Sequence, residues 1–424
     1  MGDLRTIRVG VVGLGGRGRD DARILLNVPG VVIPCVCDVV EERVRQGIEV
    51  VKSNSGDAYP VTGYSDYREM FEKEKLDAVL CATTWITHAR VAVAAMNAGL
   101  DVGIEVGGAA SERECWDMVR TSERTGKFCM MLENCCYDRN EMLVWNMHRH
   151  GLFGTLIHCE GGYRHDLRDE ISLGRENIHG RLYNFQRRNG ELYPTHELGP
   201  LCKLLGINRG NRLLYLTSMA SKGGGLNRWI KDNKGADYDL ADYPFNEGDV
   251  VTTMIKCANG ETITLNHDCS LPRFYSRDYM VQGTKGLFTE REERVWLDRV
   301  TPRDDDVDCE KTDIEYYRSR YEHPLWKKYI DDGEKVRLGH GGMDYFVECA
   351  FAESVRERKA PPIDVYDTAL WMAITYLSEQ SVAMGSMPVP IPDFTDGMWI
   401  DREPYERGMY CLSEICDDFF EEKR

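Results

Sequence analysis

The stretch that decides the fold is Ile7-Arg8-Val9-Gly10-Val11-Val12-Gly13-Leu14-Gly15-Gly16-Arg17-Gly18, near the start of the chain. Its first half is an apolar run with the length of a short buried strand, and its second half fits the pattern G-x-G-x-x-G. An apolar-periodic segment through Leu25 and Leu26 follows. Strand, glycine-rich turn and helix in this order are typical of a Rossmann domain that binds a dinucleotide.

Each glycine of the motif has a physical task. Gly13 permits the tight turn, Gly15 lets backbone approach a pyrophosphate, and Gly18 lets the helix pack closely on the strand. The N-terminus of that helix offers free N–H groups and a positive dipole to the phosphates. We therefore expect the cofactor to contact the loop residues Gly13, Gly15, Gly16, Arg17 and Gly18.

An acidic residue follows the second expected strand. The run Val31–Cys37 ends just before Asp38, which lies about 20 residues after Gly18, where a partner of the ribose 2′-hydroxyl belongs. A carboxylate there would repel the 2′-phosphate of NADP, so the sequence favours NAD. The alternative is that Asp38 is an ordinary turn residue at a strand end.

Strands and helices continue to alternate up to about residue 138. Residues 76–81, 100–105 and 127–132 read as buried strands, and 88–98 and 112–125 as helices. This alternation predicts a doubly wound parallel sheet, whose ligands lie at the carboxyl ends of the strands. The further cofactor contacts expected there are Thr84, Trp85, His88, Glu105 and Asn134.

The pattern of expected elements changes after residue 138. Short β-runs at 154–161, 213–220, 249–257, 261–268 and 279–282 have no crossover helices between the last three, which predicts an antiparallel or mixed sheet. We expect a Rossmann domain at 1–138, an α+β substrate domain with a large, mostly antiparallel open sheet at 139–394, and a surface-wrapping tail at 395–424. Residues 301–338 read as a surface excursion, and 343–359 and 366–384 as two amphipathic helices.

Composition excludes several classes of function. The 424 residues carry a net charge of −17, which disfavours nucleic acid and anionic membrane as partners. No apolar stretch approaches the ~20 residues that span a bilayer, and the first residues lack the apolar segment of a signal peptide. The 15 cysteines include no Cys-x-x-Cys pair. We expect a cytoplasmic protein with reduced thiols and no metal site.

Motifs spread along the chain resemble those of a known family. The matching segments are GGRG at 15–18, EVG at 105–107, ENCCY at 133–137, EGGYRHD at 160–166, YPTH at 193–196, PRFYSR at 272–277 and GHGGMD at 339–344. Together they resemble the glucose-fructose oxidoreductase/inositol dehydrogenase (Gfo/Idh/MocA) superfamily. More narrowly, the chain is similar to the NAD-dependent glycosidases of glycoside hydrolase family 109, whose best-known activity is that of an α-N-acetylgalactosaminidase.

One departure from the wider superfamily is informative. Its sugar dehydrogenases usually carry Glu-Lys-Pro after the fifth strand, with the lysine as acid and base. This chain has Glu105-Val106-Gly107, and valine cannot move a proton. Family 109 shares that substitution, so the resemblance favours a glycosidase over a plain alcohol dehydrogenase.

The resemblance implies a mechanism in which NAD⁺ oxidises sugar C3, a base removes the C2 proton, the C1 substituent leaves, water adds, and returned hydride restores the hydroxyl. It implies Tyr137, Tyr193 and His196 as catalytic residues, and Arg181, Tyr193, His196 and Tyr275 as substrate contacts. His165 and His340 are further candidates because they lie beside glycine-rich turns. The expected partner is a small glycoside, most often with terminal α-N-acetylgalactosamine.

Alternatives remain open from the sequence. The chain could be an NAD-dependent sugar or polyol oxidoreductase, a glycosidase of the same mechanism acting on other hexosides, including β-linked ones, or a non-catalytic NAD and sugar sensor. Tyr137 and Tyr193 could be packed structural residues, and Arg181 part of a solvated basic face. The superfamily commonly pairs through its second sheet, so a homo-oligomer, a dimer or larger, is expected.

Overall fold

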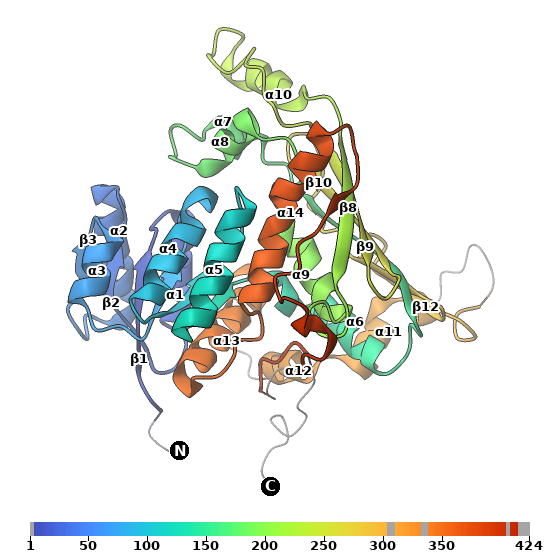
Figure 1. Ribbon diagram of the computed structural model, residues 1–424, viewed down its shortest axis with the longest axis horizontal. Helices are drawn as coiled ribbons and strands as arrows, with labels where there is room; N and C mark the ends of the chain where they lie inside the picture. The colour runs from blue at the N-terminus through green and yellow to red at the C-terminus, as the bar shows by residue number, and fades with distance from the viewer. Residues whose placement is uncertain (1–3, 303–309, 332–337, 404–407, 414–424) are drawn as a thin grey trace.

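Two β-sheets organise the molecule. The computed structural model describes residues 4–302, 310–331, 338–403 and 408–413 (Figure 1). A six-stranded sheet has the order β3-β2-β1-β4-β5-β6, and an eight-stranded sheet has the order β13-β12-β11-β7-β10-β9-β8-β14. All neighbours in the first sheet are parallel, whereas in the second only β7 and β10 are. The predicted fold class is confirmed.

The first sheet is a doubly wound Rossmann sheet. Five of its strands are apolar along almost their whole length because helices cover both faces, whereas the edge strand Thr62–Tyr64 is largely exposed. The strands are β1 (Ile7–Val12), β2 (Val31–Cys37), β3 (Thr62–Tyr64), β4 (Ala78–Cys81), β5 (Asp101–Ile104) and β6 (Cys129–Met131). The helices between them are α1 (Gly16–Leu25), α2 (Glu41–Ser55), α3 (Tyr67–Lys73), α4 (Trp85–Asn97) and α5 (Glu112–Thr125).

The second sheet is open on one face. Burial alternates along β9, from buried Thr253 and Ile255 to half-exposed Met254, because one face packs on helices α9 and α14 and the other does not. The strands are β7 (Leu156–Arg164), β8 (Leu213–Ala220), β9 (Val251–Cys257), β10 (Thr262–Asp268), β11 (Met280–Gly283), β12 (Gly286–Thr289), β13 (Arg294–Leu297) and β14 (Val389–Pro390).

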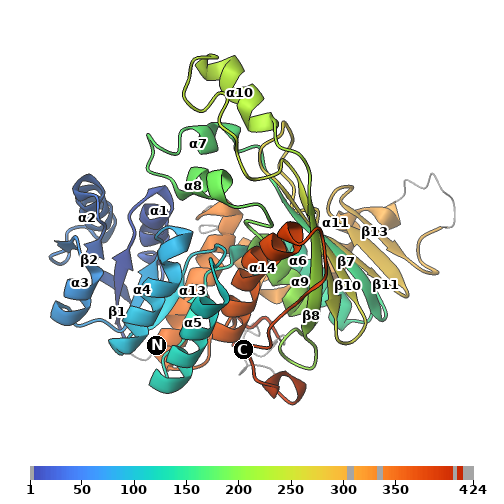
Figure 2. The ribbon, with the colours of Figure 1, turned by 45° about the horizontal axis from the view of Figure 1, so that its top comes forward.

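Short helices connect the strands of this second region. They are η1 (Asn134–Tyr137), α6 (Arg139–Arg149), α7 (Arg168–Ser172), α8 (Gly180–Arg187), α9 (Thr195–Leu204), α10 (Gly225–Lys234), η2 (Glu310–Thr312), α11 (Ile314–Tyr321) and α12 (Pro324–Asp331). Later in the chain come η3 (His340–Gly342), α13 (Met343–Glu357), α14 (Val365–Ala383) and η4 (Met398–Ile400). In both views α7, α8 and α10 project beyond one end of the two sheets (Figures 1 and 2).

Helices α13 and α14 differ from the amphipathic helices that we predicted. Both are buried on nearly all sides, and Trp371 of α14 is fully buried. The reason is their position: α13 packs on α1 and η1, while α14 packs on α5 and β6 on one side and on β8 on the other (Figure 2). They therefore join the two sheets through one apolar core. Although α14 is long and apolar, no helix among the described residues meets the requirements for crossing a membrane.

The prediction of a surface excursion over residues 301–338 is wrong for the part that the structure describes. Helices α11 and α12 form there, and Trp326 of α12 is buried with its indole N–H donating to the backbone oxygen of Tyr137 at 2.9 Å. Buried aromatic side chains hold this segment against the core. The two helices are too short to show a helical period in the sequence. Residues 303–309 and 332–337 of that range, and 404–407 and 414–424 of the expected tail, lie outside the described residues.

The cysteines serve as packing groups. The 13 cysteines in the described ranges are all buried, and none of them forms a disulfide. Burial raises the pKa of the Cys81 thiol on β4 to about 11 and that of the Cys257 thiol on β9 to about 12. These thiols are therefore protonated at neutral pH.

Candidate active site

The glycine loop has the shape of a dinucleotide cradle. Gly13 has φ +94°, and a Cβ there would lie 2.5 Å from the Ala82 backbone oxygen. A Cβ on Gly18 would collide with the Gly13 backbone oxygen, whereas Cβ atoms on Gly15 and Gly16 would meet nothing within 4 Å. The outer glycines are thus needed for packing, and the middle ones leave open backbone at the start of α1. This arrangement fits a bound pyrophosphate.

Asp38 lies beside the same loop at the end of β2. Its carboxylate accepts the Leu14 N–H at 2.7 Å and the Val40 N–H at 2.9 Å. Each carboxylate oxygen has a second lone pair, so a ribose hydroxyl can still donate to it. Asp38 therefore holds the loop and fits the predicted ribose contact.

Arg17 connects the loop to two other segments. Its guanidinium lies 3.0 Å from Asp21, 3.1 Å from Glu105 and 2.8 Å from Asp344 at the start of α13. Asp344 also accepts the Asn134 side-chain N–H at 2.5 Å. Burial alone would raise the pKa of the Asp344 carboxyl, but His340 and Arg17 outweigh it and hold that pKa well below its usual range.

Three expected cofactor contacts thus share one charge network: Arg17, Glu105 and Asn134. His340, the second-tier candidate, is mostly exposed and bonds through Nδ1 to Asp344 at 2.7 Å. His340 therefore bonds to the charge network from the solvent-exposed side.

The turn before α4 forms the next part of the cleft. Thr84 is exposed at the start of that helix, and a Cβ on Gly180 of α8 would contact it at 3.5 Å, so the second domain closes over this point. Trp85 fits against Gly107, where any Cβ would collide with the indole. His88 is buried, and its Nε2 bonds to the Thr83 backbone oxygen at 3.0 Å. The structure therefore gives His88 a contact that supports the turn.

A cluster of aromatic rings brings most of the predicted substrate residues together. Tyr163, at the end of β7, occupies its centre, with ring-centroid distances of 4.4 Å to Tyr193, 5.5 Å to His196 and 6.5 Å to Tyr275. Trp85, from the Rossmann side, lies 5.3 Å from Tyr193. Both domains therefore contribute to one aromatic wall at the carboxyl ends of the Rossmann strands.

Arg181 lies within this wall. Its guanidinium carbon is 4.8 Å from the Tyr193 ring, 5.4 Å from the Trp85 ring and 5.6 Å from the Tyr163 ring, and its Nε donates to Glu170 at 2.7 Å. The faces of aromatic rings attract a cation, so this cage fixes the guanidinium. The alternative of a solvated basic face does not hold for Arg181, because its side chain is only 12% exposed.

His196 is held by a buried carboxylate. Its Nδ1 lies 2.7 Å from Oε1 of Glu133, which is fully buried directly after β6. Burial alone would raise the pKa of Glu133, but His196 and donors from Thr195 and Cys135 outweigh it and lower that pKa. An ionised carboxylate can only accept, so the proton is on Nδ1 and Nε2 keeps a free lone pair.

A close approach of two elements makes this geometry possible. A Cβ on Gly161 of β7 would lie 2.5 Å from the Glu197 Cβ of α9, so glycine at 161 lets α9 pack tightly against β7. The helix carries His196 and the strand carries Tyr163. Gly161, two residues before the tyrosine, therefore sets the spacing between the two polar rings.

The structure does not bring Tyr137 to this cluster. Its side chain is fully buried in η1, and the hydroxyl donates to the Tyr410 backbone oxygen at 2.8 Å. Burial raises the pKa of Tyr137 well above its usual value, which opposes ionisation. The expectation that it faces the nicotinamide fails because the 3₁₀ turn after Glu133 directs the ring into the core. We remove Tyr137 from the proposed catalytic set.

Three residues of the site were not named as candidates from the sequence: Glu133, Tyr163 and Asp344. Each lies within a motif that the resemblance had marked, ENCCY, EGGYRHD and GHGGMD. Their position in the sequence could have identified two of them, since Glu133 follows a strand directly and Tyr163 follows two glycines. Their partners come from distant parts of the chain, so only the fold assigns their contacts.

Glu133, Cys135 and His196 also form a possible metal-ligand group, with one donor atom from each lying within 4.8 Å of the others. Each donor, however, already has a partner of another kind. His196 and Glu133 bond to each other, and the Arg277 guanidinium donates to the Cys135 sulfur at 3.6 Å. A cation beside the thiol disfavours a second cation, so we propose no metal ion at this group.

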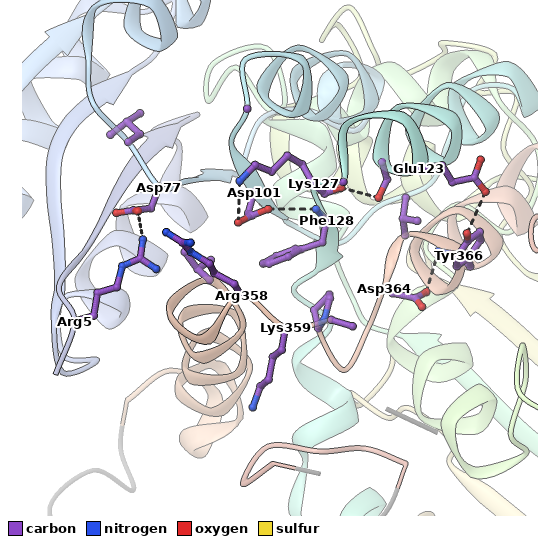
Figure 3. Close-up of a pocket in the computed structure, with 18 of the residues that line it drawn as sticks. Arg5, Asp77, Asp101, Glu123, Lys127, Phe128, Arg358, Lys359, Asp364 and Tyr366 are labelled. Carbon is purple, nitrogen blue, oxygen red and sulfur yellow. Dashed lines mark hydrogen bonds and ion pairs between the residues drawn. The ribbon is translucent and has the colours of Figure 1, made fainter. Parts of the chain in front are cut away.

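A separate cavity of about 700 Å³ lies at the opposite, amino-terminal edge of the Rossmann sheet. Figure 3 shows that its charged and polar groups bond among themselves: Arg5 with Asp77, and Tyr366 with Glu123. None of the site residues named above lines it. We therefore assign the chemistry to the region where the glycine loop and the aromatic wall meet.

Comparison with known proteins agrees with this geometry. A family model described as "Oxidoreductase family, NAD-binding Rossmann fold" matches residues 7–133, and one described as "Glycosyl hydrolase 109, C-terminal domain" matches residues 137–401. A protein named alpha-N-acetylgalactosaminidase from Tannerella forsythia is 39% identical over 420 residues, covering 94% of this chain and 88% of that protein. The chain belongs to glycosyl hydrolase family 109. A family 109 protein from Parabacteroides distasonis is 38% identical, with 94% and 89% covered.

Solved structures that resemble this family 109 chain include two dehydrogenases with bound cofactor. Levoglucosan dehydrogenase in complex with NADH has a TM-score of 0.69 at 19% identity, covering 92% of this chain and 100% of that one. A scyllo-inositol dehydrogenase from Lactobacillus casei with bound NAD(H) and scyllo-inositol has a TM-score of 0.62 at 13% identity, with 91% and 99% covered. At these identities the likeness shows the shared fold.

The buried His88 predicts a loss of stability in acid. Burial lowers the pKa of His88 from 6.5 to about 4, so the unfolded chain binds the proton more readily. The stabilising contribution is complete above pH 6.5 and is lost as the pH falls towards 4, roughly 3 kcal/mol for this one group. We expect His88→Gln to reduce the difference in Tm between pH 7 and pH 4.5. An unchanged difference would contradict this role.

Proposed function

We propose that this family 109 chain is an NAD-dependent glycosidase that removes terminal α-N-acetylgalactosamine from small glycosides. The observation that carries the proposal is the joining of a dinucleotide cradle to an aromatic wall that holds Tyr163, Tyr193 and His196. Its support includes relatives named alpha-N-acetylgalactosaminidase and the buried Val106, which cannot supply the proton transfer of a sugar dehydrogenase. The buried, reduced thiols fit a cytoplasmic location.

The cradle residues fit NAD, which when bound would accept hydride from sugar C3 and later return it. Gly15 and Gly16 would approach the pyrophosphate, Asp38 would accept from a ribose hydroxyl, and Glu105 and Asn134 would meet the cofactor near the aromatic wall. Thr84 and Trp85 lie where the Rossmann region contacts α8 and Tyr193. The proposed contacts place the sugar against Tyr163 and Tyr275.

His196 is proposed as one base of the reaction. Glu133 holds its Nδ1–H, so Nε2 can take a proton from the sugar and return it later. Burial raises the pKa of Tyr163, and Arg181 beside its ring opposes that rise by stabilising the phenolate. Because its hydroxyl also lies in the aromatic wall, Tyr163 is proposed as a second proton-transfer group. Arg181, Tyr193 and Tyr275 would bind and orient the sugar. Oxidation at C3 acidifies the C2 proton, and loss of that proton expels the C1 substituent.

The activity can be tested with p-nitrophenyl N-acetyl-α-galactosaminide and NAD⁺. We expect release of p-nitrophenol that depends on NAD⁺ and leaves no net NADH, because the reaction oxidises and then reduces the same carbon. The measurement is absorbance at 405 nm beside 340 nm. Steady NADH formation from free sugars without cleavage of any p-nitrophenyl glycoside would favour the sugar or polyol oxidoreductase, and cleavage of the β-anomer alone would change the proposed substrate.

The role of His196 predicts a specific loss. His196→Asn should lower kcat/KM by about 10² to 10⁴, the usual effect of removing a positioned acid or base. Glu133→Gln should also lower kcat/KM, since an amide no longer requires the proton on Nδ1. NAD binding and Tm should stay near the parent values for His196→Asn. If activity is lost only together with folding, His196 is a structural residue.

We also propose that the chain forms a homo-oligomer through the open face of its second sheet. Apolar side chains lie exposed on that face, three of them on two neighbouring strands towards one edge and one on the opposite edge strand: Tyr215 and Met219 on β8, Met254 on β9 and Trp296 on β13. An exposed apolar face of this kind is commonly covered by a partner. A second copy offers the same antiparallel surface and could pair about a two-fold axis.

Met254→Asp tests this surface. A charge between Tyr215 and Met219 of the neighbouring strand should shift the protein towards monomer in light scattering at micromolar concentration, because burying an unpaired carboxylate is unfavourable. Ile400→Asp, at an exposed apolar residue outside the sheet, is the matched control and should leave the mass unchanged. A parent protein that is already monomeric would rule the proposal out.

A further inference from the structure

A histidine outside the proposed catalytic set contacts the central tyrosine. The Tyr163 hydroxyl lies 3.2 Å from Nδ1 of His165, two residues further along the chain. Tyr163 is only 5% exposed, whereas His165 is partly exposed. The imidazole therefore lies between a buried hydroxyl and solvent.

The position of His165 is fixed from both sides. Its backbone N–H donates to the Asp268 backbone oxygen at 3.0 Å, which continues the pairing of β7 with β10. Its ring packs edge-on against Tyr275 at 5.0 Å. The imidazole therefore lies between the Tyr163 hydroxyl and a proposed sugar contact.

The charges around His165 favour the neutral ring. Burial, followed by the Arg181 cation, lowers the pKa of His165, and the opposing effects of Glu170, Asp166 and Asp169 are smaller. A neutral imidazole has one nitrogen free to accept a proton near neutral pH. Nδ1, facing the phenol, can therefore accept, while Nε2 carries the exchangeable proton.

We propose that His165 is a proton relay that connects Tyr163 to solvent, an inference that rests on the proposed function. The phenol O–H bond breaks, its proton binds Nδ1 of His165, and Nε2 releases its own proton to water. The resulting phenolate, stabilised by Arg181, takes the proton from sugar C2. When the sugar is reprotonated, the same transfers run in reverse, so no proton is gained or lost over a turnover.

The relay makes a prediction about isotopes that a structural role would not make. In D₂O, a relay that works quickly replaces the proton on Tyr163 by deuterium before it returns to C2. Without the relay, the proton removed from C2 stays on Tyr163 and can return to the same carbon. The deuterium fraction at C2 of the product therefore measures the connection between Tyr163 and solvent.

The test uses the full-length protein with NAD⁺ and p-nitrophenyl N-acetyl-α-galactosaminide in D₂O. We expect nearly full deuteration at C2 by NMR for the parent protein. His165→Asn keeps a polar group but cannot relay a proton, so turnover should fall by roughly 10²-fold and the deuterium fraction should fall with it. Added imidazole should restore part of both in His165→Ala. His165→Gln replaces the asparagine variant if that variant has a lowered Tm.

The control is His158→Asn. His158 is on the same strand but on the open face of the sheet, bonded to Thr262 at 2.8 Å, and should change neither quantity. A slowed His165→Asn with an unchanged deuterium fraction and no rescue by imidazole would overturn the relay, as would unchanged turnover. A parent protein that cleaves the glycoside without deuterium at C2 would also overturn the relay. Cleavage that does not depend on NAD⁺ would instead refute the proposed function, which keeps the two failures distinct.

Discussion

The interaction on which the site depends is the set of ion pairs made by Arg17. One guanidinium contacts three carboxylates that belong to different parts of the chain: Asp21 in α1, Glu105 after β5 and Asp344 at the start of α13. Removing such a cation would leave buried negative charges without a partner, which is far more costly than losing an exposed pair. The glycine loop, a strand end and a helix from the end of the chain are thereby held in one arrangement.

That arrangement explains how two sheets produce one cleft. Helices α13 and α14 fill the space between the sheets, so the strand ends of the first lie opposite the end of β7 in the second. Small residues then let the polar groups approach, with Gly107 beneath Trp85 and Gly161 beneath α9. The site is a property of the packing between domains, and neither sheet contains it alone.

Local pattern was sufficient to predict the Rossmann half. Its glycine motif, apolar strands and Asp38 act within a few dozen residues of one another, so their spacing carries the information. The same reasoning was wrong for Tyr137, because closeness to a strand end in sequence says nothing about which way a 3₁₀ turn directs a side chain. The contacts of Glu133 with His196 and of Asn134 with Asp344 join segments far apart in the chain, so no local pattern could reveal them.

The helices near the end of the chain also show what local sequence pattern cannot predict. Residues 343–359 and 366–384 were correctly expected to be helical, but the burial of α14 against both α5 and β8 removes the polar stripe that an amphipathic helix needs. A helix enclosed on all sides is apolar all round. The apolar sequence of α14 is explained only by the position of this helix between the two sheets.

The buried cysteines can report when each sheet of this protein unfolds. Alkylating reagents attack the thiolate, and burial raises the pKa of the Cys81 and Cys257 thiols, so both stay protonated and shielded while the fold is intact. Cys81 lies in the first sheet and Cys257 in the second, so each becomes fast to label only when its own sheet opens. A timed pulse of reagent, followed by mass spectrometry, would record which half of the molecule comes apart first, without any introduced probe.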